Sequence, residues 1–354
     1  MLAFFFVPHG YHIFLVEKDY TAKMKMIGAW SFCAMAILKY AIVLARRDGI
    51  KRCIDRIAMD WKNVDKSYHR EIMLRNAKTC RVFTKLCVVF MFSGSMFHST
   101  LLPVVTTTKS SGTSGIHNLS ANKVLPFPSE FIMFDAKISP MYEIVFVGHT
   151  VSVAVLCTVA SGVCTLAVKF VMHAYSQYQI VISLLECLEV DENLDSNNTE
   201  KQMNDILRRH LHVLTFVPKI ETVLNEICLV ELVGCTLNIC FVGYHLIMKW
   251  EDSEPLGIIT YIVLLTSFVS NIFIFCYIGE LLTEQSKKVG LACYMIDWWY
   301  LPRGQARAVV MFIAASDFPI KFTAGKIINL SLQSFCSVIK ASVTYLNVLR
   351  NSMV

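Results

Sequence analysis

Residues 46–85 read RRDGIKRCIDRIAMDWKNVDKSYHREIMLRNAKTCRVFTK, and this stretch decides how the rest of the chain is arranged. It joins an apolar run near residues 26–45 to another near residues 82–105, and twelve of its residues are lysine or arginine. In membrane proteins, basic residues gather in the loops on the cytoplasmic side. We therefore predict that this loop is cytoplasmic, which fixes the direction in which each apolar run crosses the membrane.

The composition is typical of a membrane protein. Of the 354 residues, 55% are hydrophobic and 17% are charged, and the mean hydropathy is +0.51. An ordinary soluble domain is roughly 45–50% apolar. The formal net charge of +6 does not indicate nucleic-acid binding, because the basic residues stand at the ends of apolar runs and form no basic tail. We expect a lipid bilayer as the surroundings and no nucleic acid as a partner.

Seven apolar segments are expected to cross the membrane. A spanning helix needs about 20 apolar residues, and six runs reach that length, near residues 26–45, 82–105, 141–170, 227–248, 256–280 and 323–349. The opening MLAFFFVPHGYHIFLVE is shorter and contains Pro8 and Gly10, and it lacks the basic start and cleavage site of a secretory signal. We interpret it as a truncated first helix whose beginning is missing. The predicted fold is a single all-α domain, residues 1–354.

The orientation follows by alternation from the basic loop. Segments 171–226 and 281–320 fall on the cytoplasmic side, and 18–25, 103–140 and 249–255 fall outside. The N-terminus is then cytoplasmic and the C-terminus extracellular, which is the reverse of a G-protein-coupled receptor. Asn118 begins the sequon Asn118-Leu119-Ser120 on the outer side, where we predict a glycosylation site. The sequon at Asn197 lies on the cytoplasmic side, where it would not be used.

The predicted cytoplasmic segments are longer than simple connections. Helical apolar spacing continues through residues 171–190 and resumes in 201–226, after the polar stretch VDENLDSNNTEK. We expect the fourth and fifth helices to extend into the cytoplasm as paired rods, with a mobile loop between them and with 50–80 and 284–315 beside them. These extensions are either soluble helical loops or a docking platform for other subunits, and the pattern leaves both open.

The sequence lacks the common motifs of catalytic and cofactor-binding sites. It contains no Walker loop, dinucleotide fingerprint, paired-histidine zinc helix or nucleophile elbow, so we expect neither an enzyme nor a cofactor. None of the thirteen cysteines lies in 103–140, and we expect most of them to be small packing residues. Isolated polar residues within the runs are interpreted as interhelical hydrogen-bonding groups: Glu143, His149, Glu231, Asn238, Asn271 and Glu280.

The last helix differs because its polar residues recur. Steps of four, three, four, three and four residues place six of them on one helical face: Gln333, Ser337, Lys340, Thr344, Asn347 and Asn351. The opposite face is predicted to hold Phe335, Val338, Ile339, Val343, Leu346 and Leu349. Copies of such a helix around a symmetry axis would line a water-filled pore. A polar helix-packing seam explains the same pattern, and Lys340 would repel cations in a pore.

Several stretches together resemble one family. The terminal segment FPIKFTAGKIINLSLQSFCSVIKASVTYLNVLR closely resembles the C-terminal signature of insect odorant receptors, especially those abundant in ants, bees and wasps. The resemblance extends over nearly the whole chain, with YEIVFVGH from residue 142, FVMHAYSQ from 170, LNEICLVELVGCTLNIC from 224, YIGELLTEQSKKVG from 277 and YMIDWWYLP from 294.

This resemblance implies a seven-helix tuning subunit of a ligand-gated, non-selective cation channel in the plasma membrane of a sensory dendrite. Its partner would be a shared odorant co-receptor in a heterotetramer. The resemblance further implies that residues 1–280 hold helices 1–6 with an outer-half ligand pocket, and that 281–354 hold the cytoplasmic anchor between subunits and the pore-lining helix. The pore and gate residues it implies are Ser337, Thr344, Asn347, Val348, Asn351 and Ser352.

Within the implied gate, Val348 takes the place of the apolar constriction that follows the Thr-Tyr pair. The next constriction position falls on Ser352, which is polar, so the co-receptor would supply the second apolar ring. A gustatory-type receptor channel and a metabotropic seven-helix receptor are the alternative functions.

The expected ligand pocket is aromatic and rich in methionine, with few polar groups. Such a lining suits a small, volatile, apolar molecule held by shape and by one or two hydrogen bonds. The residues assigned to it lie in the outer halves of four helices: Met26, Trp30, Phe92, Met96, Phe97, Phe146, His149, Thr150, Tyr261 and Leu265.

Overall fold

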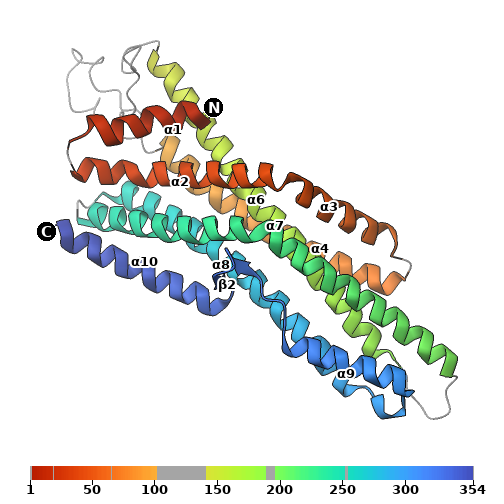
Figure 1. Ribbon diagram of the computed structural model, residues 1–354. Helices are drawn as coiled ribbons and strands as arrows, with labels where there is room; N and C mark the ends of the chain where they lie inside the picture. Colours follow the sequence, from red (N-terminus) through yellow and green to blue (C-terminus); the bar gives the residue numbers. More distant parts are fainter. Residues whose placement is uncertain are drawn as a thin grey trace, which may run out of the picture.

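The computed structural model describes residues 2–18, 20–64, 66–101, 141–188, 196–251 and 254–353, and these residues are mostly helical (Figure 1). Hydrocarbon offers no hydrogen-bond partner to the backbone, and a helix satisfies its own N–H and C=O groups. The elements are α1 (Leu2–Tyr11), the π-helical turn η1 (His12–Val16), α2 (Tyr20–Ala45), α3 (Arg47–Lys62), α4 (Ser67–Met96), the π-helical turn η2 (Phe97–Leu101), α6 (Met141–Glu186), α7 (Ser196–Glu251), α8 (Pro255–Met295), the 3₁₀ turn η3 (Trp298–Tyr300), α9 (Arg303–Asp317), β1 (Thr323–Ala324), β2 (Ile328–Asn329) and α10 (Leu332–Met353).

Five helices in the described part are long and apolar enough to cross a membrane, at Met26–Ala45, Ser67–Thr100, Met141–Glu186, Thr199–Glu251 and Pro255–Met295. They contain five of the six full-length runs predicted from the sequence. The short α1 with η1 and the polar-striped α10 take the two remaining places of a seven-helix arrangement. The predicted glycosylation site, Asn118, lies outside the described residues.

The last apolar run was predicted to be helical from residue 323, and that boundary is wrong. Residues 323–329 form a small antiparallel hairpin in which Thr323 pairs with Asn329 and Ala324 with Ile328. Gly325 in its turn has φ +59°, a left-handed conformation that glycine adopts without strain. α10 begins only at Leu332, after Ser331, whose Oγ accepts a hydrogen bond from the Ser334 N–H at 3.2 Å.

Three helices continue well beyond the length that a bilayer requires. α6 has 46 residues, α7 has 56 and α8 has 41. At 1.5 Å per residue these helices are roughly 60–85 Å long, against a hydrocarbon core of about 30 Å. Together with α3, α9 and the beginning of α4, they form an elongated end of the molecule, away from both chain termini, which we call the extension (Figure 1). The predicted paired rods are therefore present.

The core of the molecule runs along α6, α7 and α8 and includes Phe170, Tyr178, Phe216 and Phe275, each at most 2% exposed. Eleven of the thirteen cysteines are buried and all thirteen are free, which confirms their predicted role as packing residues. At Gly279 a Cβ atom would stand 2.6 Å from the Leu330 carbonyl oxygen. Glycine at this position therefore allows the chain just before α10 to lie directly against α8.

Candidate pore helix and ligand-binding region

α10 is attached to the bundle along one face. It packs on α7 and α8, with Val338 and Ser342 buried in the contact. Ser342 Oγ donates to the Val338 carbonyl oxygen at 2.9 Å and also lies 3.4 Å from the Thr236 carbonyl oxygen of α7. Leu346 fills the space beside Gly243, where a Cβ would come within 3.2 Å of it.

The other face of α10 is exposed and carries the predicted polar stripe. All six of its members are exposed in the single chain: Gln333, Ser337, Lys340, Thr344, Asn347 and Asn351. Val348 stands beside them at 60% exposure. Ser337 and Thr344 donate their hydroxyls to carbonyl oxygens of their own helix, at 3.0 and 2.9 Å. The side chain of Ser352 lies outside the described part of the chain.

One assignment to the packed face of α10 is wrong. Val343 was placed there but is 50% exposed, while the buried position belongs to Ser342. The packing line runs through Val338, Ser342 and Leu346 in steps of four residues, which leaves Val343 on its flank. A hydroxyl takes a buried place because the carbonyl oxygen of Val338, one turn earlier in the helix, accepts its hydrogen bond.

An ion pair between Lys39 of α2 and Glu231 of α7 is buried inside the apolar bundle. Lys39 Nζ contacts Glu231 Oε2, and the two side chains are 0% and 1% exposed. The Asn271 side chain of α8 donates to Glu231 Oε1, and the Cys235 thiol lies 3.2 Å from the same oxygen. An ionised group in hydrocarbon is stable only when paired, so this network sets the register of α2, α7 and α8.

Two other isolated polar residues also form the predicted interhelical bonds. Asn238 of α7 accepts a hydrogen bond from Ser31 of α2 at 3.0 Å. Glu280 of α8 accepts one from the backbone N–H of Leu332, the first residue of α10, at 3.2 Å. A carboxylate at this position satisfies a donor that the start of a helix leaves without an intrahelical partner.

Sequence reasoning missed Lys39, although a signal was present. Lys39 is the one charged residue in the run 26–45, and Glu231 is the one charged residue in the run 227–248. A lone cation on one spanning helix and a lone anion on another are a candidate pair, because each needs a counterion within the membrane.

Five of the predicted pocket residues lie where α1, α2, α4 and α6 meet. The ring of Trp30 stacks on Phe6 with centroids 4.9 Å apart, and the carbonyl oxygen of Met26 is 3.4 Å from His9 Nε2. Phe92 and Met96 of α4 pack against a cluster of α2 and α6 residues that includes Cys33 and Leu156. His149 of α6 is completely buried.

A second group surrounds Tyr261 of α8. Its ring centroid lies 5.9 Å from that of His98 in η2 and 5.4 Å from that of His245 in α7. Leu265, about one turn further along α8, packs against the main core. The sequence analysis did not assign His98 or His245 to the pocket, because the ten histidines are scattered along the sequence and no pattern brings these two together. Only the fold shows that residues 98, 245 and 261 meet.

The remaining three predicted pocket residues are half-buried. Phe97 begins η2, and Thr150 donates to the carbonyl oxygen of Phe146 at 3.0 Å. The ten residues thus fall into separate groups at the end of the bundle opposite the extension. Two hollows in the described part of the chain, of about 420 and 590 Å³, lie in the extension instead, and none of the ten lines either one.

An elongated, mostly helical bundle with apolar spans, an intramembrane ion pair and a polar-striped last helix defines a multi-pass membrane protein. A model of the family described as 7tm Odorant receptor matches residues 22–343. The chain belongs to the odorant receptor family. This family assignment agrees with the prediction that the chain is not an enzyme.

Curated relatives agree with this assignment. Odorant receptor 13a of Drosophila melanogaster is 24% identical over 242 residues, which are 64% of this chain and 57% of the relative. Odorant receptor 10 of Aedes albopictus is 22% identical over 227 residues, which are 64% of this chain and 60% of the relative. The chain thus spans about three-fifths of the length of these relatives.

The fold matches solved insect receptors more completely. The olfactory receptor OR5 of Machilis hrabei superposes with a TM-score of 0.76 at 14% identity, over 98% of this chain and 86% of that receptor. Its complex with eugenol gives the same TM-score at 15% identity, over 98% of this chain and 85% of that receptor. The seven-helix fold is therefore confirmed. The closer likeness to receptors of ants, bees and wasps stays a prediction.

The buried ion pair predicts how substitutions of Lys39 and Glu231 change the stability of the protein. Lys39→Met leaves Glu231 buried without a counterion, and breaking a buried pair in this way costs about 3–5 kcal/mol. We expect a clearly lowered midpoint of thermal unfolding for the purified protein in detergent. Lys39→Met combined with Glu231→Leu should recover much of the loss, because no buried charge is left.

Lys78→Met removes an exposed lysine of α4 and serves as the matched control. An equal drop in the control, or a Lys39→Met protein with an unchanged midpoint, would show that the pair does not hold the bundle together.

Proposed function

We propose that this chain is the tuning subunit of a heteromeric, ligand-gated, non-selective cation channel in the plasma membrane of sensory dendrites. A shared odorant co-receptor is the proposed partner. The observation that carries the proposal is the exposed polar stripe of α10, on a helix whose opposite face packs against α7 and α8. Residues 1–280 hold the ligand-binding helices, and 281–354 hold the anchor segment and the pore helix.

The polar stripe supports a pore because it needs water. Hydrocarbon is an unfavourable solvent for Lys340, Asn347 and Asn351, and the single chain covers none of them. Copies of α10 placed around a symmetry axis would face one another across a hydrated path. Val348, exposed near the end of the stripe, forms the apolar collar at which this path dewets and closes. The co-receptor supplies the next apolar ring.

The basic loop supports the orientation. α3 and the first part of α4 carry ten of the twelve lysine and arginine residues of the loop 46–85, so we place the extension in the cytoplasm, the N-terminus inside and the C-terminus outside. The extension then forms the anchor between subunits, and the outer ends of the helices face the source of the ligand.

The ligand is a small, volatile, apolar molecule. The aromatic groups around Trp30 and Tyr261 would hold it by dispersion, and the imidazoles of His98 and His245 offer one or two hydrogen bonds. Eugenol, the ligand of the Machilis hrabei complex, is a molecule of this kind. Ligand binding to the open arrangement shifts the equilibrium, and about 5.5 kcal/mol of differential affinity moves a 1:99 ratio to 99:1.

The test of the proposed function is a current recording from cells that express the chain with and without the co-receptor while a panel of volatile ligands is applied. We expect a cation current that needs both subunits and persists when G-protein signalling is blocked. A tag on the C-terminus should label on intact cells. A response abolished by the block, with the tag accessible only after permeabilisation, would favour the metabotropic alternative.

Val348→Ala should raise the basal current severalfold in the same cells, because a smaller collar dewets less readily. Val343→Ala is the matched control, since Val343 is also exposed on α10 but lies outside the stripe. Equal basal currents in the two variants and the wild type would remove Val348 from the gate.

Tyr261→Ala should change the rank order of ligand potencies while surface expression stays near the wild-type level, because the ring joins His98 and His245. Tyr277→Ala removes another aromatic ring of α8, one that packs on Phe83 and Phe273, and should leave the order unchanged. If both variants reduce all responses in proportion, Tyr261 is a packing residue.

A further inference from the structure

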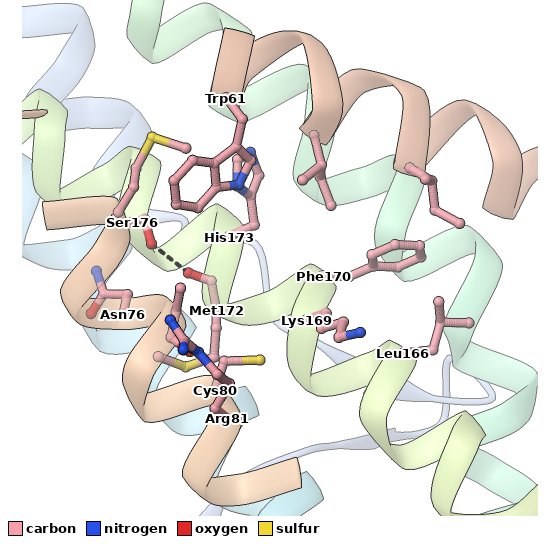
Figure 2. Close-up of a pocket in the computed structure, with 14 residues that line it drawn as sticks. Trp61, Asn76, Cys80, Arg81, Leu166, Lys169, Phe170, Met172, His173 and Ser176 are labelled. Carbon is pink, nitrogen blue, oxygen red and sulfur yellow. Dashed lines mark hydrogen bonds between the residues drawn. The ribbon is translucent and has the colours of Figure 1, made fainter. Parts of the chain in front are cut away.

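A groove of about 420 Å³ lies between α3 and the packed pair α4 and α6 (Figure 2). Its floor is apolar and well buried, with Met73, Cys80, Phe170 and Met172 all at or below 8% exposure. Its size is within the range of roughly 300–1,000 Å³ that is usual for sites of small organic ligands.

α3 stands over this groove and is held to α6 and α7 by charged side chains. The Asp60 carboxylate of α3 reaches His173 of α6 at 2.9 Å and His212 of α7 at 3.4 Å. Figure 2 shows Trp61 projecting from α3 over His173. Ile54, at 48% exposure, and Trp61, at 36%, leave the apolar interior open to the surroundings.

The polar groups inside the groove are already satisfied by the protein. The Asn76 amide donates to Gln179 Oε1 at 2.7 Å, and the Ser176 hydroxyl donates to the Met172 carbonyl oxygen at 2.7 Å. His173 is engaged by Asp60. The interior therefore makes little demand for hydrogen bonds from an occupant, which favours an aliphatic chain.

Two cations line the groove without a counterion. Arg81 of α4 and Lys169 of α6 are exposed, and no carboxylate of the described residues lies within 4.0 Å of either. They lie near each other, because α4 and α6 pack together and both cations line the same groove beside Cys80. A ligand with a negatively charged headgroup would supply the counterion that Arg81 and Lys169 lack.

The two cations lie where the apolar parts of α4 and α6 end. Arg81 directly precedes the apolar run near residues 82–105, and Lys169 stands at the end of the run near 141–170. In the proposed orientation this edge of the apolar region faces the cytoplasmic leaflet, where anionic lipids are concentrated and basic pockets between helices bind their headgroups.

We propose that this groove is a binding site for an anionic phospholipid of the cytoplasmic leaflet. Arg81 and Lys169 hold the phosphate of the headgroup at the membrane edge. One acyl chain turns out of the bilayer into the apolar groove, where it lies over Phe170 and Met172 beneath Trp61, on the cytoplasmic side of the headgroup. The site is separate from the ligand-binding residues and from α10. The bound lipid fills the space between α3 and the α4–α6 pair, beside the contact of Asp60 with His173.

The test uses the full chain, purified in a neutral detergent, and phosphatidylserine brominated in its acyl chains, which quenches nearby tryptophan fluorescence. Among the five tryptophans only Trp61 lines the groove, so the wild type minus Trp61→Phe isolates its signal. We expect this signal to be quenched by brominated phosphatidylserine and much less by brominated phosphatidylcholine. Arg81→Gln with Lys169→Gln should weaken apparent binding at least about tenfold, given two lost cation–lipid attractions.

Two further variants separate the site from general effects. Lys78→Gln with Lys85→Gln removes two exposed cations of α4 that do not line the groove, and binding should stay within about twofold of the wild type, because these charges do not touch the headgroup. Ala77→Phe fills the groove and leaves both cations in place, and it should abolish the Trp61 quenching.

Three results would each overturn the proposal. These are equal quenching of Trp61 by the charged and the neutral lipid, equal losses in the two double variants, and full quenching in Ala77→Phe. The measurement reads lipid contact and not current, so it is independent of the proposed channel activity.

Discussion

The pairing of Lys39 with Glu231 is the constraint on which the arrangement of the bundle depends. Most contacts between the spanning helices are apolar, and apolar contacts tolerate small slides along a helix axis because lipid and side chain are alike in polarity. A buried charge tolerates none, since a displacement leaves it without a partner. With Asn271 donating to the same carboxylate, α2, α7 and α8 are held at one level.

The network of Lys39, Glu231 and Asn271 lies between two regions of the bundle to which different roles are assigned. Toward one end, α7 and α8 carry His245 and Tyr261 in the aromatic group assigned to the ligand. Toward the other, the same continuous helices run into the extension, where α9 packs against α8. α10 is attached to both α7 and α8. Any change in the angle between these two helices therefore reaches α10 directly, through its contacts with both of them.

The spans could be read from the sequence because uninterrupted apolar runs and flanking cations act locally, residue by residue. Contacts that join distant segments could not. Nothing near His98 indicates that it meets Tyr261 and His245, and Val343 was misplaced because a helical wheel does not say which line of side chains meets α7. The hairpin at 323–329 was missed because its residues were included in the apolar run 323–349, although Gly325 and Lys326 at the turn and Asn329 after it interrupt that run.

The hairpin also determines how α10 can move. At its beginning the helix is clamped by the hairpin, by the contact of Leu330 with Gly279, and by the bond from Leu332 to Glu280. Val348 lies sixteen residues beyond Leu332, or roughly 24 Å at 1.5 Å per residue. Beyond this clamp α10 contacts α7 mainly through apolar packing such as that of Leu346 beside Gly243, which can slide. A tilt of only about 5° at the clamp would carry Val348 about 2 Å sideways over that length. In the proposed channel, the apolar collar at Val348 stands near the end of the helix that is far from this clamp, so a small rotation between helices would change the width of the pore there.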